Sequence, residues 1–118
     1  MQDRPTMAEL LEAVEEFIAK DIRPHLDAHR AFNARVAENI LAIVRRELAM
    51  GPAADMAERA RLVALLGHEG DLASLNRDLA AAIRTRSLAG RDREVLAHLQ
   101  ATVRDKLAID NPKYARED

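Results

Sequence analysis

Two histidines four residues apart, His25 and His29, are the first candidates for chemistry in this sequence. On one helix this spacing places two imidazoles on the same face, where Zn²⁺ could bind, and Asp21 lies four residues before His25. Pro24 and Asp27 interrupt this arrangement, because proline ends or kinks a helix and aspartate commonly caps the start of a new one. We therefore predict no metal site, although His25 and His29 are the residues nearest to one.

Polar side chains also stand in or beside the apolar stripes of the expected helices. A polar group that becomes buried must find a partner. Such residues therefore either line a polar pocket between helices, or form hydrogen bonds and ion pairs that fix the helix register. The second interpretation is favoured, and Arg35 is the expected partner for Asp21. The candidate polar cluster consists of Asp21, Arg35, Asn39, Glu47, Asn76 and Arg86.

Recognised catalytic signatures are missing from the sequence. It contains no glycine-rich phosphate loop, nucleophile elbow, His-Glu-x-x-His motif or kinase motif. The absence of cysteine excludes disulfides, thiolate metal sites and thiol catalysis. We expect no cofactor and no catalytic residues, so a self-contained enzyme is the less favoured alternative.

Composition and charge exclude some classes of binding partner. The net charge of −2 and the sequence pI near 6.1 lack the positive field of a nucleic-acid or anionic-membrane binder. The segment 52–86 superficially resembles a helix-turn-helix, but Asp71–Asn76, where its recognition helix would begin, offers no cation to DNA. No apolar run approaches the roughly 20 residues of a membrane span, and no export signal is visible. We expect a cytoplasmic protein that binds neither nucleic acid nor membrane.

Glycine and proline residues divide the chain into helical segments. Thr6 and Glu9 form a capping box at the first helix, Pro24 should end it near Ile22, and Asp27 and Asp71 are expected N-caps. Gly51-Pro52 is expected to end the second helix and start the third. The predicted helices cover about 7–22, 28–50, 52–66, 72–86 and 92–109.

These helices define the expected fold. Because no segment alternates like a strand, the fold class is all-α: a compact bundle of about five helices, mostly antiparallel. Residues 1–118 should form a single helical domain with flexible ends at 1–5 and 112–118. The helix over 28–50 should be central, because its apolar residues cover about half of its circumference. They are Phe32, Val36, Ala37, Ile40, Leu41, Ile43, Val44 and Leu48.

Three sequence blocks carry a resemblance to a known family. They are Arg4-Pro5-Thr6-x-x-Glu9-Leu10-Leu11, Phe32-x-x-Arg35-Val36-Ala37-x-Asn39 and Asn111-Pro112. In these blocks the chain resembles an uncharacterised bacterial helical domain family found beside or attached to aminoglycoside-phosphotransferase-like kinases and encoded near acyl-CoA dehydrogenases. The resemblance implies an accessory domain in such a system and supplies no catalytic residues.

Two functional hypotheses follow. The first is a non-catalytic helical interaction module that associates with itself, as a homodimer, or with a kinase-like or dehydrogenase partner. The second is a small-ligand-binding or auxiliary enzymatic domain that uses Asp21, Arg35, Asn39 and Glu47 around a pocket between helices.

Overall fold

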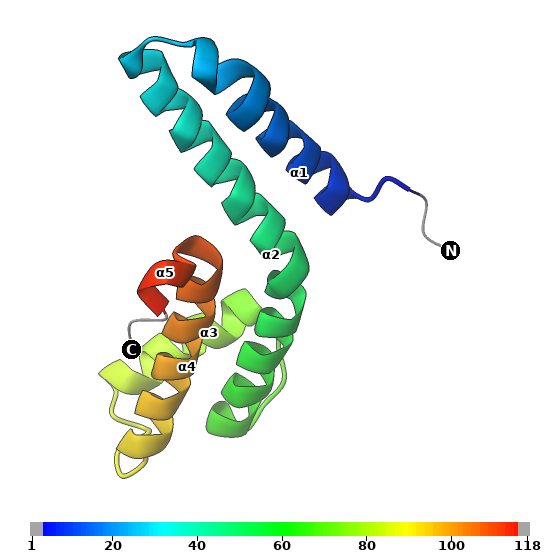
Figure 1. The fold of residues 1–118 in the computed structure, drawn as a ribbon. Coiled ribbons are helices and arrows are strands. Elements are labelled where there is room, and N and C mark those ends of the chain that lie inside the picture. Colours follow the sequence, from blue (N-terminus) through cyan, green and yellow to red (C-terminus); the bar gives the residue numbers. More distant parts are fainter. Residues whose placement is uncertain (1–3, 116–118) are drawn as a thin grey trace. The chain divides into compact units, whose positions relative to one another are not determined.

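The protein is built from helices joined by short turns (Figure 1). The computed structural model describes residues 4–115 and contains no strand in that range, which confirms the all-α fold class. In chain order the elements are α1 (Met7–Phe17), the π-helix η1 (Ile18–Ile22), the 3₁₀-helix η2 (Arg23–His25), α2 (Ala28–Leu66), α3 (Leu72–Arg84), α4 (Asp92–Asp110) and α5 (Pro112–Ala115).

The chain forms two compact units, Met1–Met50 and Gly51–Asp118, called unit 1 and unit 2 below. The boundary between them falls within α2. The predicted flexible ends lie partly outside the described residues, and the part at 112–115 forms the short helix α5. No helix in the described range is both long and apolar enough to cross a bilayer.

Local capping signals operate as the sequence predicts. The hydroxyl of Thr6 accepts from the backbone N–H of Glu9, and the Glu9 carboxylate accepts from the backbone N–H of Thr6, both at 3.1 Å. The chain continues as the wider π-helix η1 and then as the tighter 3₁₀-helix η2. Pro24 is in η2 and has no backbone N–H to donate. Asp27 and Asp71 accept from the backbone N–H three residues on, at 2.9 and 2.8 Å, and so cap α2 and α3.

The predicted helix break at Gly51-Pro52 is wrong. Residues 28–66 form one helix of 39 residues, with Pro52 in its interior. A glycine commonly ends a helix by adopting a left-handed conformation, and Gly51 does not take a positive φ. Its backbone stays helical, and Pro52 costs the helix the one hydrogen bond that its missing N–H would donate to Leu48.

Unit 1 is a helical hairpin made of α1, η1, η2 and the first part of α2. Two ion pairs join its arms: Arg23 Nε to Glu38 Oε2 at 2.8 Å and Arg45 Nε to Glu15 Oε2 at 2.7 Å. Arg23, late in the first arm, pairs with Glu38, early in the second arm. Glu15, early in the first arm, pairs with Arg45, later in the second arm, as expected for an antiparallel hairpin. No residue between 4 and 50 is buried, so this unit contains no enclosed apolar core.

Unit 2 contains the apolar core, formed where α3 packs on the second part of α2. Leu62, Leu75 and Leu79 are at its centre, and Leu62 and Leu75 have no exposed surface. Partly buried apolar side chains surround them: Val63, Leu66, Leu72 and Leu88.

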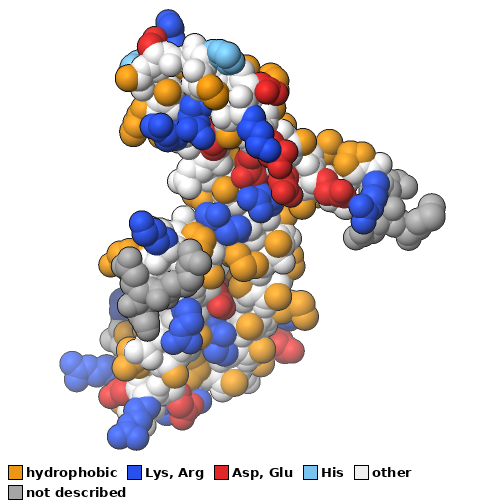
Figure 2. All heavy atoms as spheres, in the orientation of Figure 1, with side chains coloured by type: hydrophobic (Ala, Val, Ile, Leu, Met, Phe, Trp, Pro, Cys, Tyr) orange, Lys and Arg blue, Asp and Glu red, His pale blue; other side chains and the backbone are white. Residues whose placement is uncertain are grey.

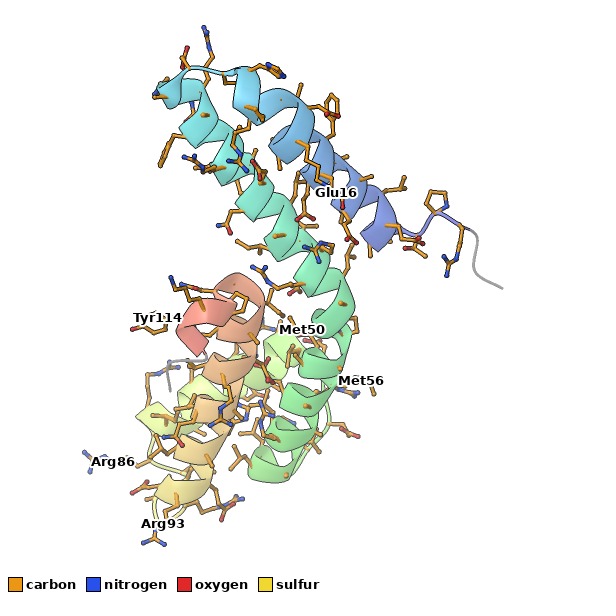
Figure 3. All side chains as sticks on the ribbon, viewed as in Figure 1. Glu16, Met50, Met56, Arg86, Arg93 and Tyr114 are labelled. Carbon is orange, nitrogen blue, oxygen red and sulfur yellow. The ribbon has the colours of Figure 1, made fainter. Side chains whose placement is uncertain are left out.

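Two apolar faces of unit 2 differ from their expected roles. Met56, which its spacing with Ala60 and Val63 places on an apolar helix face, is 74% exposed and points away from α3 and α4 (Figure 3). The buried positions of that segment are instead Glu58, Leu62 and Leu65, because a hydrogen bond described below allows the Glu58 carboxylate to be buried. On α4, Leu96, Leu99 and Val103 are likewise exposed.

Candidate functional site

A partly buried polar cluster links the three main helices of unit 2. Glu58 on α2 is 9% exposed, and its Oε2 accepts from Nδ2 of Asn76 on α3 at 3.1 Å. The same amide group also donates to the backbone carbonyl of Leu72 at 3.2 Å. Asn76 therefore satisfies the carboxylate that α2 directs toward α3, as a buried polar group requires.

The second part of the cluster joins α2 to α4 through Arg61. Its Nε donates to Nδ1 of His98 at 3.0 Å, and its Nη2 donates to the hydroxyl of Thr102 at 3.1 Å. His98 is 3% exposed. Because His98 and Thr102 stand four residues apart on one face of α4, the planar guanidinium can bridge them with two donors in a fixed geometry.

The charge state of His98 follows from these contacts. Burial lowers the pKa of His98, the positive charge of Arg61 lowers it further, and the negative charge of Glu58 partly opposes both effects. A guanidinium can only donate, so Nδ1 of His98 must accept and the ring hydrogen lies on Nε2. His98 is therefore a neutral imidazole with a fixed tautomer.

This polar lock, defined as Glu58, Arg61, Asn76, His98 and Thr102, positions helices rather than reactive atoms. Its atoms donate to and accept from one another, and no buried side-chain nitrogen or oxygen within residues 4–115 lacks a partner. A histidine whose Nδ1 is already occupied by a cation has no lone pair left there to accept a substrate proton. The lock therefore sets the register of α2, α3 and α4.

The six residues of the predicted polar cluster are all exposed. Asp21, Arg35, Asn39 and Glu47 belong to unit 1, and no hydrogen bond or ion pair joins any two of the six within the described chain. Arg35 has no recorded contact with Asp21, and the cross-hairpin pairs are instead Arg23–Glu38 and Arg45–Glu15. Of the six, Asn76 alone forms a hydrogen bond to a buried side chain, that of Glu58.

The histidines proposed as nearest to a metal site, His25 and His29, are exposed. Among the described residues no group of three or more His, Asp or Glu side chains lies close enough to hold a metal ion. η2 ends at His25, and α2 starts at Ala28 after an extended residue, Leu26. The two imidazoles thus belong to different helical segments. Their four-residue spacing therefore does not place them on one helix face as metal ligands.

Sequence reasoning missed most of the polar lock, although one signal for it was present. Ala101, Leu107 and Ala108 of α4 are half-buried, and the other buried or half-buried positions of this helix form a row: Val95, His98, Thr102, Asp105 and Ile109. Their spacing alternates between three and four residues, as a packed helix face requires. Leu96, Leu99 and Val103 have an equally helical spacing and are larger and more apolar, so hydrophobicity alone favours them over the polar row as the packed face.

A cleft of about 450 Å³ lies in unit 2 between the end of α3 and the start of α4. Its walls are mostly apolar, with Ile83, Leu88, Leu96 and Leu99 among them, and Arg86 and Asp92 add charge. Arg86 follows the end of α3 with φ of +59°. Its N–H donates to Ile83 and that of Ser87 donates to Ala82, the two bonds of a Schellman helix end.

The largest departure from a closed fold is in unit 1, where large apolar side chains form two exposed stripes. Figure 2 shows hydrophobic side chains on the visible surface of both units. The exposed fractions of the side chains in the two stripes of unit 1 range from 41% to 67%. The stripes of unit 1, as named below, are Met7, Leu10, Val14 and Phe17 on α1, and Phe32, Val36, Ile40, Val44 and Leu48 on α2.

These stripes revise the expected central role of the helix over 28–50. Five of the eight residues in its wide apolar arc are exposed, and Ala37, Leu41 and Ile43 are half-buried. A wide apolar arc predicts several neighbouring helices. Within residues 4–50 the neighbouring arm is α1 with η1, and one arm cannot cover an arc of that width.

Comparison with known proteins gives one family match. Residues 24–114, more than three quarters of the chain, match the family described as domain of unknown function DUF6285. The matched range includes the α2 stripe, the polar lock and the cleft. No curated protein and no solved structure matches the chain. Because the match covers most of its length, the chain belongs to the DUF6285 family.

Proposed function

We propose that the protein is a non-catalytic helical interaction module that binds a protein partner through the stripes of unit 1. One observation carries this proposal: nine large apolar side chains are 41–67% exposed in a unit that buries none of its residues between 4 and 50. Monomeric soluble proteins rarely expose apolar patches beyond a few hundred Å². A surface of this kind favours a role in association.

The area of the stripes supports the proposal. Large apolar side chains carry roughly 150–200 Å² each, so nine of them at about half exposure present roughly 800 Å². This sum over the two stripes is about the area that each partner contributes to a standard protein–protein interface. Both phenylalanines of the chain, Phe17 and Phe32, are in the stripes, with exposed fractions of 53% and 61%. Aromatic side chains are frequent energetic anchors of interfaces.

The resemblance noted from the sequence directs the choice of partner. It places related domains beside or attached to aminoglycoside-phosphotransferase-like kinases and near acyl-CoA dehydrogenases. We infer that this chain is an accessory domain of such a system and that its stripes dock on one of those enzymes or on another copy of the chain.

Co-expression tests this function. The chain would be co-purified with a phosphotransferase-like kinase and with an acyl-CoA dehydrogenase from the same gene neighbourhood, as wild type and as the double variant Phe17→Ser, Phe32→Ser. We expect one enzyme to co-purify with wild type and the double variant to bind it at least about tenfold more weakly. Met56→Ser, which removes an exposed apolar side chain from unit 2, is the matched control and should bind normally. Equal binding by all three chains would refute a role for the stripes.

A second candidate function is small-ligand binding in the cleft of unit 2. Its volume of about 450 Å³ is in the range of ligand pockets, and apolar walls with a cation at the rim suit an amphipathic anion. This replaces the pocket expected around Asp21, Arg35, Asn39 and Glu47. Thermal-shift screening against acyl-CoA thioesters, nucleotides and divalent metals tests it, with Leu96→Glu as the blocked control. A shift that persists in Leu96→Glu would place the ligand elsewhere.

A further inference from the structure

We infer that the cleft of unit 2 binds an aliphatic monocarboxylate, with the carboxylate beside Arg86 and the hydrocarbon chain along α4 toward Leu99. This inference rests on the second candidate function, because it assumes that the cleft holds a small ligand. It adds the chemical class of that ligand and the direction in which it lies.

The first two turns of α4 give the cleft a charged end and an apolar end. Asp92, Val95, Leu96 and Leu99 line it at positions i, i+3, i+4 and i+7, so they share one face of the helix. Asp92, the charged member of this row, is the first residue of α4. The three apolar residues follow it, and the face extends about 10 Å from Asp92 to Leu99.

The α3 side of the cleft has the same polarity. Ala82 and Ile83 contribute apolar surface from the last turn of α3, and Arg86 follows the end of that helix. Arg86 and Asp92 therefore both stand where the connection between α3 and α4 meets the cleft. A ligand that complements this cleft is apolar along most of its length and charged at one end.

The guanidinium of Arg86 is available to bind an anion. Its side chain forms no hydrogen bond or ion pair with any residue between 4 and 115. Figure 3 shows it extending outward from unit 2, so the charged end of the cleft is in contact with water. A carboxylate held there keeps part of its hydration, and a guanidinium can bind it through two parallel N–H···O bonds.

The charges around this end favour a ligand with one negative charge. Arg86 and Asp92 are the charged residues among those that line the cleft, and their charges of +1 and −1 sum to zero. The neighbouring Arg91 is already paired with Glu94 at 2.6 Å. A carboxylate matches the single charge of Arg86, whereas the second charge of a phosphate monoester would meet Asp92 without a further cation.

The size and lining of the cleft disfavour other ligand classes. An α-helix with its side chains is about 10–12 Å across, so one turn occupies roughly 400–600 Å³ and would fill the cleft of about 450 Å³. No aromatic side chain lines the cleft to stack a base, and its one carboxylate, Asp92, is too few ligands for a divalent cation. A hydrocarbon chain is narrow and needs only aliphatic walls.

Calorimetric titration of the full chain with hexanoate, octanoate, decanoate and dodecanoate, each below its critical micelle concentration, tests the apolar half of the inference. Each methylene that enters the cleft should tighten binding by up to about fourfold. An extended ten-carbon chain is about as long as the face from Asp92 to Leu99, so the gain should cease beyond decanoate. Leu96→Glu should abolish binding. Val103→Glu replaces an equally exposed apolar residue of α4 that does not line the cleft, and it should bind normally.

Ligands that share one chain but differ in head group test the charged half. Wild type should bind decanoate about two- to fivefold more tightly than decanol, the range of an exposed ion pair, and more tightly than decyl phosphate. Arg86→Gln should remove the preference for decanoate over decanol. Arg93→Gln, which removes an arginine outside the cleft lining, is the matched control and should retain it. Asp92→Asn should improve binding of decyl phosphate more than that of decanoate.

The outcomes separate this inference from the proposed function. Absence of carboxylate binding to wild type, full binding by Leu96→Glu, or an unchanged head-group preference in Arg86→Gln overturns the inference, provided that circular dichroism shows the variants to be folded. If an acyl-CoA thioester or a nucleotide binds in the cleft and decanoate does not, the second candidate function stands without it. Chain-length dependence that Leu96→Glu abolishes, with a preference for carboxylate that Arg86→Gln abolishes, supports the inference whether or not an enzyme binds unit 1.

Discussion

At the scale of single residues, Arg61 is the connection on which the arrangement of unit 2 depends. One guanidinium reaches His98 and Thr102 on α4 from a position on α2. Its neighbour on the same helix, Glu58, reaches Asn76 on α3. These contacts specify which residues of the three helices lie opposite one another. Apolar packing alone fixes the helix register less specifically.

The first prediction concerns the pH dependence that His98 confers. Because the folded protein lowers the pKa of His98 below its ordinary value near 6.5, the unfolded chain binds the proton more readily. The contribution to stability is complete above about pH 6.5 and is lost as the pH falls toward the lowered pKa. Urea unfolding between about pH 7.5 and 5 should therefore show a falling free energy of unfolding in wild type.

Two variants isolate this effect. His98→Gln can still accept from Arg61 and does not titrate, so the fall in stability below pH 6.5 should be smaller than in wild type. His29→Gln, at an exposed position, should retain the wild-type dependence. An unchanged pH profile in His98→Gln would contradict the assignment of a neutral, buried imidazole.

Residue-scale features were predictable from sequence only where they are local. The contacts of Thr6, Asp27 and Asp71 span three residues, and each was foreseen. Arg61 and His98 are 37 residues apart, and neither side chain carries a signal that names the other. The predicted polar cluster rested on the assumption that an apolar stripe is a buried stripe. In unit 1 the stripes are exposed, so Asp21 and Arg35 need no partner.

At the scale of elements, helix ends and helix interiors carry the clearest strain. α3 ends in a Schellman motif whose left-handed position is occupied by Arg86 rather than glycine. A side chain at φ of +59° is crowded by its own backbone. This strain borders the cleft, where unfavourable backbone geometry often accompanies function.

The second prediction follows from this helix end. Arg86→Gly should raise the free energy of unfolding by about 1 kcal/mol, because glycine adopts the left-handed conformation without crowding. Ser87→Gly is the matched control, since Ser87 does not have a positive φ, and it should give no gain. Thermal unfolding of the three chains measures the difference. Loss of stability in Arg86→Gly would mean that the arginine side chain contributes more than the strain costs.

The third prediction concerns Pro52 in the interior of α2. Pro52→Ala restores the missing donor to the Leu48 carbonyl and removes the clash of the proline ring with the preceding turn. The variant should gain about 1–3 kcal/mol in free energy of unfolding and some helical signal in circular dichroism. Ala53→Gly, which adds flexibility at the next position, should lose up to about 1 kcal/mol. A Pro52→Ala chain less stable than wild type would contradict a continuous α2.

The elements themselves were largely predictable, and the exception is instructive. Four helix starts near residues 7, 28, 72 and 92 agree with the structure, because capping and apolar period act together there. Gly51-Pro52 carries the residue types of a helix boundary, but a glycine ends a helix only if its backbone turns left-handed. Whether it does so is decided by contacts beyond the dipeptide, such as the burial of Gly51.

At the scale of the whole molecule, the two units differ in the contacts that stabilise each of them internally. Unit 2 encloses the buried leucines and the polar lock, whereas unit 1 is held by two ion pairs and half-buried apolar contacts. The sequence suggested one domain with a central second helix, because apolar stripes alone do not reveal whether their cover belongs to the same chain. We interpret the stripes of unit 1 as a surface whose cover comes from association.

Hydrogen–deuterium exchange of the free chain and of its complex with the co-purifying enzyme, compared segment by segment, tests this interpretation most directly. If the stripes are an interface, amides of α2 within residues 28–50 should exchange at least about tenfold more slowly in the complex than in the free chain. Amides of α3 and α4 should exchange alike in both samples and provide the internal control. Equal exchange of residues 28–50 in the two samples would contradict the account, because it would show that the partner does not cover the stripes of unit 1.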